Sequence, residues 1–274
     1  MNSFNGVINL FDLANLPERI ANIVEGLPWS RDDVGESSAA VVLFDNMVLK
    51  IEPVSRSSEN EIKLLQWLDG KLPVPKVIVA EVINGYSFLL MSRLVGEMAC
   101  SDDNKRGANG MVKALAKGLK MLWAVDITGC PCVNNVSEKL VQARFNIDNG
   151  LVDYDDFDDD TFGEGGFADV HDLYRFLDGN RPKEELVFSH GDFCLPNVFV
   201  DGASVTGFID WGNGGVADKW QDVALCVRSL KYNLENFGHG EKEIAKYESL
   251  LFQELGLEPN EEKIRYYILL DELF

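Results

Sequence analysis

The stretch FSHGDFCLPNVFVDGASVTGFIDWG, residues 188–212, sets a carboxylate, a carboxamide and a second carboxylate around two short apolar runs. Asp192 and Asn197 lie five residues apart, and Asp210 follows the second apolar run. Asp and Asn between strands often only cap turns, and any one of these residues alone favours that interpretation. Turn capping alone does not explain why Asp192, Asn197 and Asp210 occur together with His190 at this spacing. We therefore expect these residues to form a functional site.

Phosphoryl transfer from ATP needs one group that accepts or orients the acceptor hydroxyl and others that hold magnesium on the phosphates. Asp192 can do the first, and Asn197 and Asp210 can do the second. The order H-x-D-x-x-x-x-N, an apolar strand and I-D-x-G is that of the protein-kinase catalytic loop and metal-binding motif, with Gly191 where kinases usually carry Arg. His190 opens the loop, so we assign it to holding the loop backbone and not to proton transfer.

A second group of residues upstream is expected to grip the nucleotide. Lys50 follows an alternating apolar run in VLKIE, residues 48–52, and Glu61 lies on the next predicted helix, so the two can form the ion pair that positions the α- and β-phosphates. The loop Gly35–Ala39, GESSA, has small residues where a phosphate-covering turn is expected. The chain contains no G-x-x-x-x-G-K-[ST], which argues against a P-loop mechanism.

The chain carries a formal net charge of −20, with 25 Lys and Arg against 45 Asp and Glu. Binding to nucleic-acid phosphates requires clustered Lys and Arg, so this charge argues against a nucleic-acid partner. A cationic partner is the natural complement of the charge. The alternative, favoured on charge alone, is that acidity only keeps the protein soluble.

Cysteine usage and hydropathy indicate the compartment. The five cysteines are an odd number with no repeated spacing, which favours a reducing environment over a disulfide framework. Cys130 and Cys132 form a lone C-x-C without the second pair of a zinc site. No run of about 18 uncharged apolar residues occurs, and Asp12 and Glu18 interrupt the amino terminus before a secretory signal could form. We expect a cytoplasmic protein with no membrane contact.

Hydrophobic patterning predicts an α+β protein with two lobes that meet near residue 94. The smaller lobe, residues 1–94, is expected to bind nucleotide and to contain a helix at 13–25, an antiparallel sheet and an inserted helix at Glu59–Leu68. The expected strands are Ala39–Phe44, Met47–Ile51, Val77–Ile83 and Tyr86–Met91.

The larger lobe, residues 95–274, is expected to be mainly helical and to carry the catalytic loop. Its expected helices are residues 108–125, 137–149, 168–178, 218–235, 241–255 and 261–273, with short strands at 186–189, 197–200 and 205–209.

Turn signals and one charge run complete the pattern. Asp45-Asn46 and Asn84-Gly85 separate paired apolar runs, where tight hairpin turns demand positive φ angles. The run Asp153–Asp160, DYDDFDDD, is interpreted as a solvated loop, with a substrate-attracting rim as the alternative.

With these residues placed, the chain resembles the aminoglycoside 3'-phosphotransferases, a family that shares the protein-kinase fold. The resemblance covers nearly the whole chain and is carried by LDGKLPVPKV (68–77), by FSHGD with GFIDWGNGGVADKWQDVALCVRSL (188–230) and by KIRYYILLDELF (263–274). The HGD-x-x-x-x-N and IDWG motifs are shared with choline and macrolide kinases, whereas ADKWQD and the other two stretches are typical of this group.

The resemblance implies ATP and Mg²⁺ as cofactors and an aminoglycoside as substrate. It assigns the nucleotide contacts to Lys50, Glu61, Ser37 and the backbone of Ser92 and Leu94. Asp192 would be the catalytic base or orienting residue, with Asn197 and Asp210 as magnesium ligands. The aminoglycoside would lie in an acidic pocket that includes Arg228, Asp271, Glu272 and the terminal carboxylate of Phe274. The resemblance implies no protein partner.

Two departures from the family pattern, and two alternatives, stay open at this point. Val48 stands where an aromatic residue commonly stacks on adenine, and Asn213 stands where an Arg is frequent. One alternative is another small-molecule kinase of the same fold, acting on choline, a macrolide or a fructosamine. The other is a pseudokinase scaffold that binds nucleotide without turnover, which the full set of expected catalytic residues argues against.

Overall fold

The computed structural model describes residues 16–31, 39–154, 157, 161–163 and 165–274. The chain forms two compact units, which we call the sheet unit (Met1–Val95 with Gly207–Gly212) and the helical unit (Gly96–Thr206 with Asn213–Phe274). A single boundary near residue 94 does not describe this division, because the six residues that carry Asp210 belong to the sheet unit. Gly207 and Gly212 stand at the two ends of these six residues, but the return of the chain to the sheet unit there was not predicted from the sequence.

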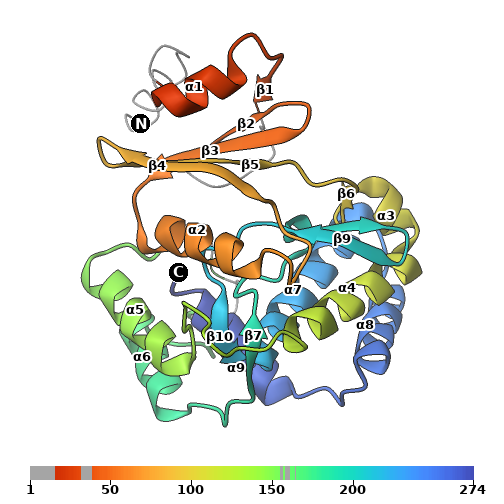
Figure 1. Cartoon of the computed structure of the whole chain (residues 1–274). Coiled ribbons are helices and arrows are strands. Elements are labelled where there is room, and N and C mark those ends of the chain that lie inside the picture. The colour runs from red at the N-terminus through yellow and green to blue at the C-terminus, as the bar shows by residue number, and fades with distance from the viewer. Residues whose placement is uncertain (1–15, 32–38, 155–156, 158–160, 164) are drawn as a thin grey trace. The chain divides into compact units, whose positions relative to one another are not determined.

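The sheet unit contains the antiparallel sheet predicted from the alternating apolar runs (Figure 1). Its strand order is β1-β2-β3-β5-β4. The strands are β1 (Ser30–Arg31), β2 (Ala40–Leu43), β3 (Met47–Pro53), β4 (Val77–Ile83) and β5 (Tyr86–Ser92). Only the two-residue strand β1 was not predicted.

The two faces of this sheet carry different helices. Alternate side chains of a strand point to opposite faces, and Leu49 and Ile51 of β3 are buried in one core with Ile20 of α1 (Glu18–Val24). Figure 1 shows α2 (Arg56–Leu68) on the other face. Lys50 therefore points towards the side of the sheet where α2 lies.

Local signals set the ends of α2 and the hairpin turns. Helix α2 begins earlier than expected because Ser55 and Ser58 form a reciprocal capping box. Asn84 and Gly85 have φ angles of 52° and 79°, as predicted for a tight hairpin turn. The hairpin predicted at Asp45-Asn46 is also present, because β2 pairs antiparallel with β3, but the positive φ expected for its turn is wrong. There the Phe44 N–H donates to the Met47 carbonyl at 2.9 Å, and neither turn residue has a positive φ.

The helical unit contains all six helices expected for it. They are α4 (Ala108–Trp123), α5 (Val136–Asp148), α6 (Val170–Gly179), α7 (Lys219–Phe237), α8 (Glu241–Leu255) and α9 (Glu261–Asp271). A further short helix, α3 (Asp102–Arg106), was not predicted. Helix α7 packs against α8 and α9 and contributes the largest share of buried residues. The α+β class is confirmed.

Short strands frame the loop at residue 190. Strand β7 (Leu186–Ser189) pairs with β10 (Gly215–Asp218), and β6 (Glu97–Met98), β8 (Val198–Asp201) and β9 (Ser204–Phe208) form a second small sheet. The sequence predicted β7, β8 and β9, which contain apolar runs, but neither the two-residue β6 nor β10, whose sequence GVAD has no such run.

Some expectations fall on residues outside the described ranges. These are the start of the helix expected at 13–25, most of the loop Gly35–Ala39, and most of the acidic run Asp153–Asp160. Among the described residues, no helix is long and apolar enough to span a bilayer.

We predict that Leu90→Ala lowers the free energy of unfolding by about 2–5 kcal/mol, because Leu90 is fully buried in the core of the sheet unit. Val82→Ala on the neighbouring strand is the control, since Val82 is 60% exposed and should change stability by less than about 0.5 kcal/mol. Urea denaturation followed by circular dichroism measures both. Equal losses would mean that Leu90 is not a core residue.

Candidate active site

Lys50 is the centre of a charged cluster in the sheet unit. Its Nζ lies 2.9 Å from Glu61 Oε2 and 2.8 Å from Asp210 Oδ1. Glu52 Oε1 is 3.7 Å away. The structure thus brings together the lysine, the helix glutamate and the second carboxylate of the 188–212 stretch, all of them expected from sequence.

The electrostatics of this cluster leave it short of positive charge. Burial acts to lower the pKa of Lys50, but Glu61, Asp210 and Glu52 outweigh it and raise that pKa above its usual value. Burial raises the pKa of Glu61 and of Glu52, and Lys50 opposes both shifts. Three carboxylates around one ammonium group give an excess of negative charge that a cation would offset.

Asp210 has an unusual backbone conformation. Its φ angle is 60°, in the left-handed region, where residues other than glycine are uncommon. Next to it Trp211 is fully buried, and its Nε1–H donates to the Phe208 carbonyl at 3.3 Å. The buried indole fixes the backbone here, and the Asp210 side chain stays about half exposed.

The helical unit holds the loop of Asp192. The Asn197 side chain donates from Nδ2 to the backbone carbonyl of Asp192 at 3.0 Å and to its carboxylate Oδ2 at 2.9 Å. The Cys194 N–H donates to the Asp192 carbonyl at 2.9 Å, and the Leu195 N–H to Ser229 Oγ of α7 at 3.0 Å. The carboxylate of Asp192 is therefore oriented by its own loop.

Asp222 of α7 holds the start of this loop. It is fully buried and accepts hydrogen bonds from the N–H groups of His190 at 2.7 Å and Gly191 at 2.9 Å. Burial raises the pKa of Asp222, and the charge of His190 and the N–H bonds act in the opposite direction. Gln221 adds a bond from Nε2 to the Gly191 carbonyl at 3.0 Å. His190 is itself fully buried, in keeping with a role in the loop backbone.

Gly191 has a steric reason to be glycine. Its φ is 82°, and a Cβ atom built on it would lie 1.7 Å from the carbonyl oxygen of Asn213. The backbone of Asn213 is in turn held by Asn134, whose Nδ2 donates to that carbonyl at 2.9 Å. The side chain that kinases carry here has no space in this loop.

The C-terminal residues expected in the substrate pocket also have defined partners. Asp271 forms an ion pair with Arg228. Glu272 Oε1 accepts a hydrogen bond from Thr161 Oγ1 at 2.7 Å. The ring of Phe274 lies 4.7 Å from the ammonium group of Lys139.

Lys139 was not expected from sequence, and it is almost fully buried on α5. Burial lowers its pKa, while the carboxylates of Asp271, Asp192 and Asp222 act to raise it. Burial also raises the pKa of the Cys194 thiol, with further contributions from Asp192 and Asp271. Both effects place Asp192 and Asp271 in one neighbourhood of the helical unit.

The remaining expected positions concern the nucleotide base and its phosphates. Ser92 ends β5, and its N–H donates to the Lys76 carbonyl at 2.9 Å. Leu94 packs on Gly207, where an added Cβ atom would lie 2.4 Å from Leu94 Cδ1. Ser37 lies outside the described residues.

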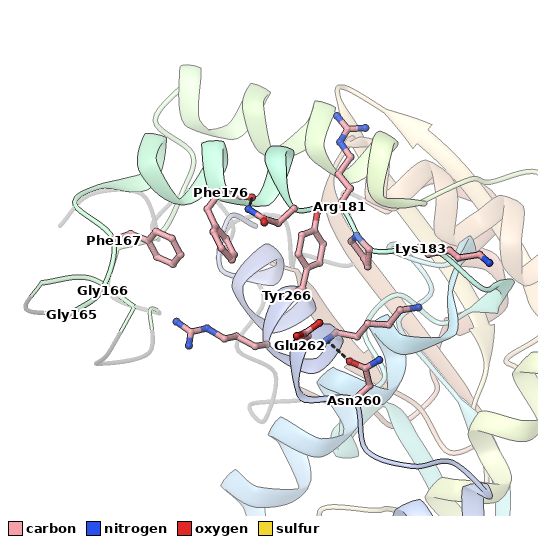
Figure 2. Close-up of a pocket in the computed structure, with 13 residues that line it drawn as sticks. Gly165, Gly166, Phe167, Phe176, Arg181, Lys183, Asn260, Glu262 and Tyr266 are labelled. Carbon is pink, nitrogen blue, oxygen red and sulfur yellow. Dashed lines mark hydrogen bonds between the residues drawn. The ribbon is translucent and has the colours of Figure 1, made fainter.

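A hollow of about 900 Å³ lies elsewhere in the helical unit, between α6 and the start of α9 (Figure 2). No residue expected in the active site lines it. Four cations line it, of which Arg181 pairs with Asp178 and Lys263 with the buried Asp218; the other two are Lys183 and Arg265. The hollow therefore does not enter the catalytic argument.

Comparisons with known proteins agree with this geometry. A family model described as the phosphotransferase enzyme family matches residues 31–245. The aminoglycoside 3'-phosphotransferase of Enterococcus faecalis is 37% identical over 268 residues, which cover 93% of this chain and 97% of that protein. That of Staphylococcus aureus is 37% identical over 267 residues, with the same coverage.

The chain belongs to the aminoglycoside 3'-phosphotransferase family. The crystal structure of a type VIII aminoglycoside 3'-phosphotransferase superposes with a TM-score of 0.77 at 27% identity and covers 93% of this chain and 97% of that one. The protein is therefore a phosphotransferase with the kinase-like fold expected from the catalytic loop.

Three residues that make contacts in this aminoglycoside 3'-phosphotransferase fold were not predicted from the sequence: Asp222, Lys139 and Thr161. Asp222 lies in the ADKWQD stretch, where a carboxylate directly before the apolar run Val223–Val227 was the available signal. Lys139 and Thr161 gave no local signal, because their partners Phe274 and Glu272 are more than a hundred residues away.

We predict that Lys50→Met lowers the free energy of unfolding by about 3–5 kcal/mol near pH 7, because it leaves the buried Glu61 without its cation. Lys63→Met is the matched control, since Lys63 pairs with Glu59 on the exposed surface of α2 and should cost less than about 1 kcal/mol. Chemical denaturation compares the two. Equal small losses would show that the cluster does not depend on Lys50.

Proposed function

We propose that this chain transfers the γ-phosphoryl group of ATP to the 3'-hydroxyl of aminoglycosides and so confers resistance to them. The observation that carries the proposal is the Asp192 carboxylate, oriented by Asn197 and sharing its neighbourhood with Asp271. A base beside a group of anions suits a hydroxyl nucleophile carried on a polycation.

The chemical step requires one proton acceptor. The 3'-oxygen forms a bond to the γ-phosphorus, the bond from that phosphorus to the β–γ bridging oxygen breaks, and ADP leaves. Asp192 takes the hydroxyl proton or orients the hydroxyl for attack, and the Asn197 amide keeps its carboxylate in place.

The sheet unit supplies the nucleotide contacts in this proposal. Lys50, held by Glu61, binds the α- and β-phosphates. Adenine lies along the end of β5, and the backbone N–H of Leu94 donates a hydrogen bond to it. The N–H of Ser92 is engaged with Lys76, so Ser92 contributes its carbonyl. Val48 replaces an aromatic stacking residue, which weakens contact with the base.

The residues proposed for magnesium fit a hard divalent cation. Asn197 uses its amide nitrogen on Asp192, which makes its oxygen the ligating atom, and Asp210 adds a half-exposed carboxylate. The negative excess around Lys50 favours a cation as well. When bound, the ion offsets charge on the phosphate oxygens.

The acidic C-terminal residues supply the substrate contacts. An aminoglycoside is a polyammonium sugar, and the carboxylates of Asp271 and Glu272 can bind its ammonium groups. The net charge of −20 adds a long-range attraction that falls with ionic strength. Choline, by contrast, favours an aromatic cage.

We predict that kanamycin is phosphorylated and that tobramycin, which lacks the 3'-hydroxyl but keeps nearly the same ammonium pattern, is a competitive inhibitor without turnover. Mass spectrometry after incubation with ATP and magnesium should show one added phosphate on kanamycin alone. Charge and shape are nearly constant in this pair, so only the nucleophile changes. Rapid phosphorylation of tobramycin would refute the 3' position, and no turnover of either compound would refute the proposed function.

A further inference from the structure

Asn134, which stands just before α5, holds two consecutive backbone carbonyls. Its side-chain Nδ2 donates to the Asn213 carbonyl at 2.9 Å and to the Gly214 carbonyl at 2.9 Å. Because both partners are acceptors, the NH₂ group and not the amide oxygen must face them. Asn134 is only 9% exposed, so a side chain without these donors would leave two carbonyls poorly compensated. The amide therefore fixes the turn formed by Asn213 and Gly214.

The backbone around Asn134 is fixed along the strand that follows this turn, β10. The Val216 N–H donates to the Cys132 carbonyl at 3.0 Å, and the Asn134 N–H donates to the Val216 carbonyl at 3.0 Å. Gly215 has a φ of 147°, and a Cβ atom built on it would lie 2.7 Å from the Cys132 carbonyl oxygen. The main chain before α5 thus lies directly against β10, and the Asn134 side chain extends this contact to the turn.

The same turn packs against the loop of Asp192. Strand β10 pairs with β7 so that Gly215 lies opposite Ser189, directly before that loop (Figure 1). The Asn213 carbonyl oxygen lies 1.7 Å from the position that a Cβ atom of Gly191 would take. This oxygen therefore lies directly against the backbone of Gly191, the residue before Asp192.

A displacement of the turn is transmitted to Asp192 through Gly191. Helix α7 holds Gly191, whose N–H donates to Asp222 at 2.9 Å and whose carbonyl accepts from Gln221 at 3.0 Å. Protein interiors are closely packed, so an Asn213 carbonyl that rotates towards Gly191 must displace it. Gly191 and Asp192 share one planar peptide unit, so Asp192 shifts with Gly191.

We propose that Asn134 is a positioning residue for phosphoryl transfer, which sets the place of Asp192 by holding the turn that packs against Gly191. This inference rests on the proposed function, in which Asp192 accepts the proton of the acceptor hydroxyl or orients that hydroxyl. A general base acts only within hydrogen-bond reach of its proton, so the effect of Asn134 falls on kcat.

The test is Asn134→Leu, which nearly keeps the side-chain size and removes both donors. kcat for kanamycin should fall about five- to fiftyfold, as expected for one or two lost hydrogen bonds, while KM for kanamycin and KM for ATP stay within about twofold. Hydrogen exchange of residues 189–194 in the free protein should become faster, because the loop then packs against a looser turn.

Asn134→Asp, measured at pH 8, separates the hydrogen bonds from the packing and serves as the test if Asn134→Leu does not fold. Aspartate has the shape of asparagine, but its ionised carboxylate offers no N–H and repels the two carbonyl oxygens. kcat should again fall by at least about fivefold. A wild-type kcat in Asn134→Asp would overturn the proposal, since packing at this position would then be sufficient.

Asn149→Leu is the matched control, because Asn149 also donates from its side-chain amide to a backbone carbonyl, that of Phe145 at the other end of α5. It should change neither kcat nor the exchange of residues 189–194. A rise in both KM values at unchanged kcat in the Asn134 variants would also overturn the proposal. A wild-type chain without kanamycin turnover would refute the proposed function and this role together, whereas wild-type turnover with unaffected Asn134 variants would refute this role alone.

Discussion

The start of α7 has two fully buried carboxylates, Asp218 at the N-cap and Asp222 in the first turn, and the functional parts of the helical unit depend on them. Buried charge is costly unless hydrogen bonds compensate for it. Asp222 obtains these bonds from the backbone of His190 and Gly191, and Asp218 obtains them from Lys263 and Tyr267 of α9. Because each buried carboxylate needs these hydrogen bonds, Asp222 fixes the loop that carries Asp192. For the same reason Asp218 fixes α9, the helix that leads to Asp271 and Glu272.

The sheet unit follows a different electrostatic principle. Around Lys50 the carboxylates outnumber the cation, so the cluster is incomplete on its own, and the left-handed backbone of Asp210 adds local strain. Such arrangements favour ligand binding over stability. The helical unit satisfies its buried carboxylates internally, whereas the sheet unit keeps negative charge for an incoming cation.

Sequence predicted the features that depend on local pattern or on one compact motif. Alternation gave the sheet, and the spacing in residues 188–212 gave Asp192, Asn197 and Asp210. It could not give Lys139 or Asn134, because their partners lie far along the chain and local sequence does not reveal what packs on either residue. The Asp45-Asn46 turn shows a further limit, since residues that tolerate positive φ do not require it.

The central claim is that Asp222 acts through Asp192, and a double-mutant cycle on kcat for kanamycin tests it most directly. The account predicts that Asp222→Asn lowers kcat by about ten- to a hundredfold in the wild-type chain, because one loop N–H loses its acceptor. In an Asp192→Asn background, where the oriented carboxylate is already gone, the same change should cost less than about threefold. An equal factor in both backgrounds would contradict the account, because Asp222 would then act independently of Asp192.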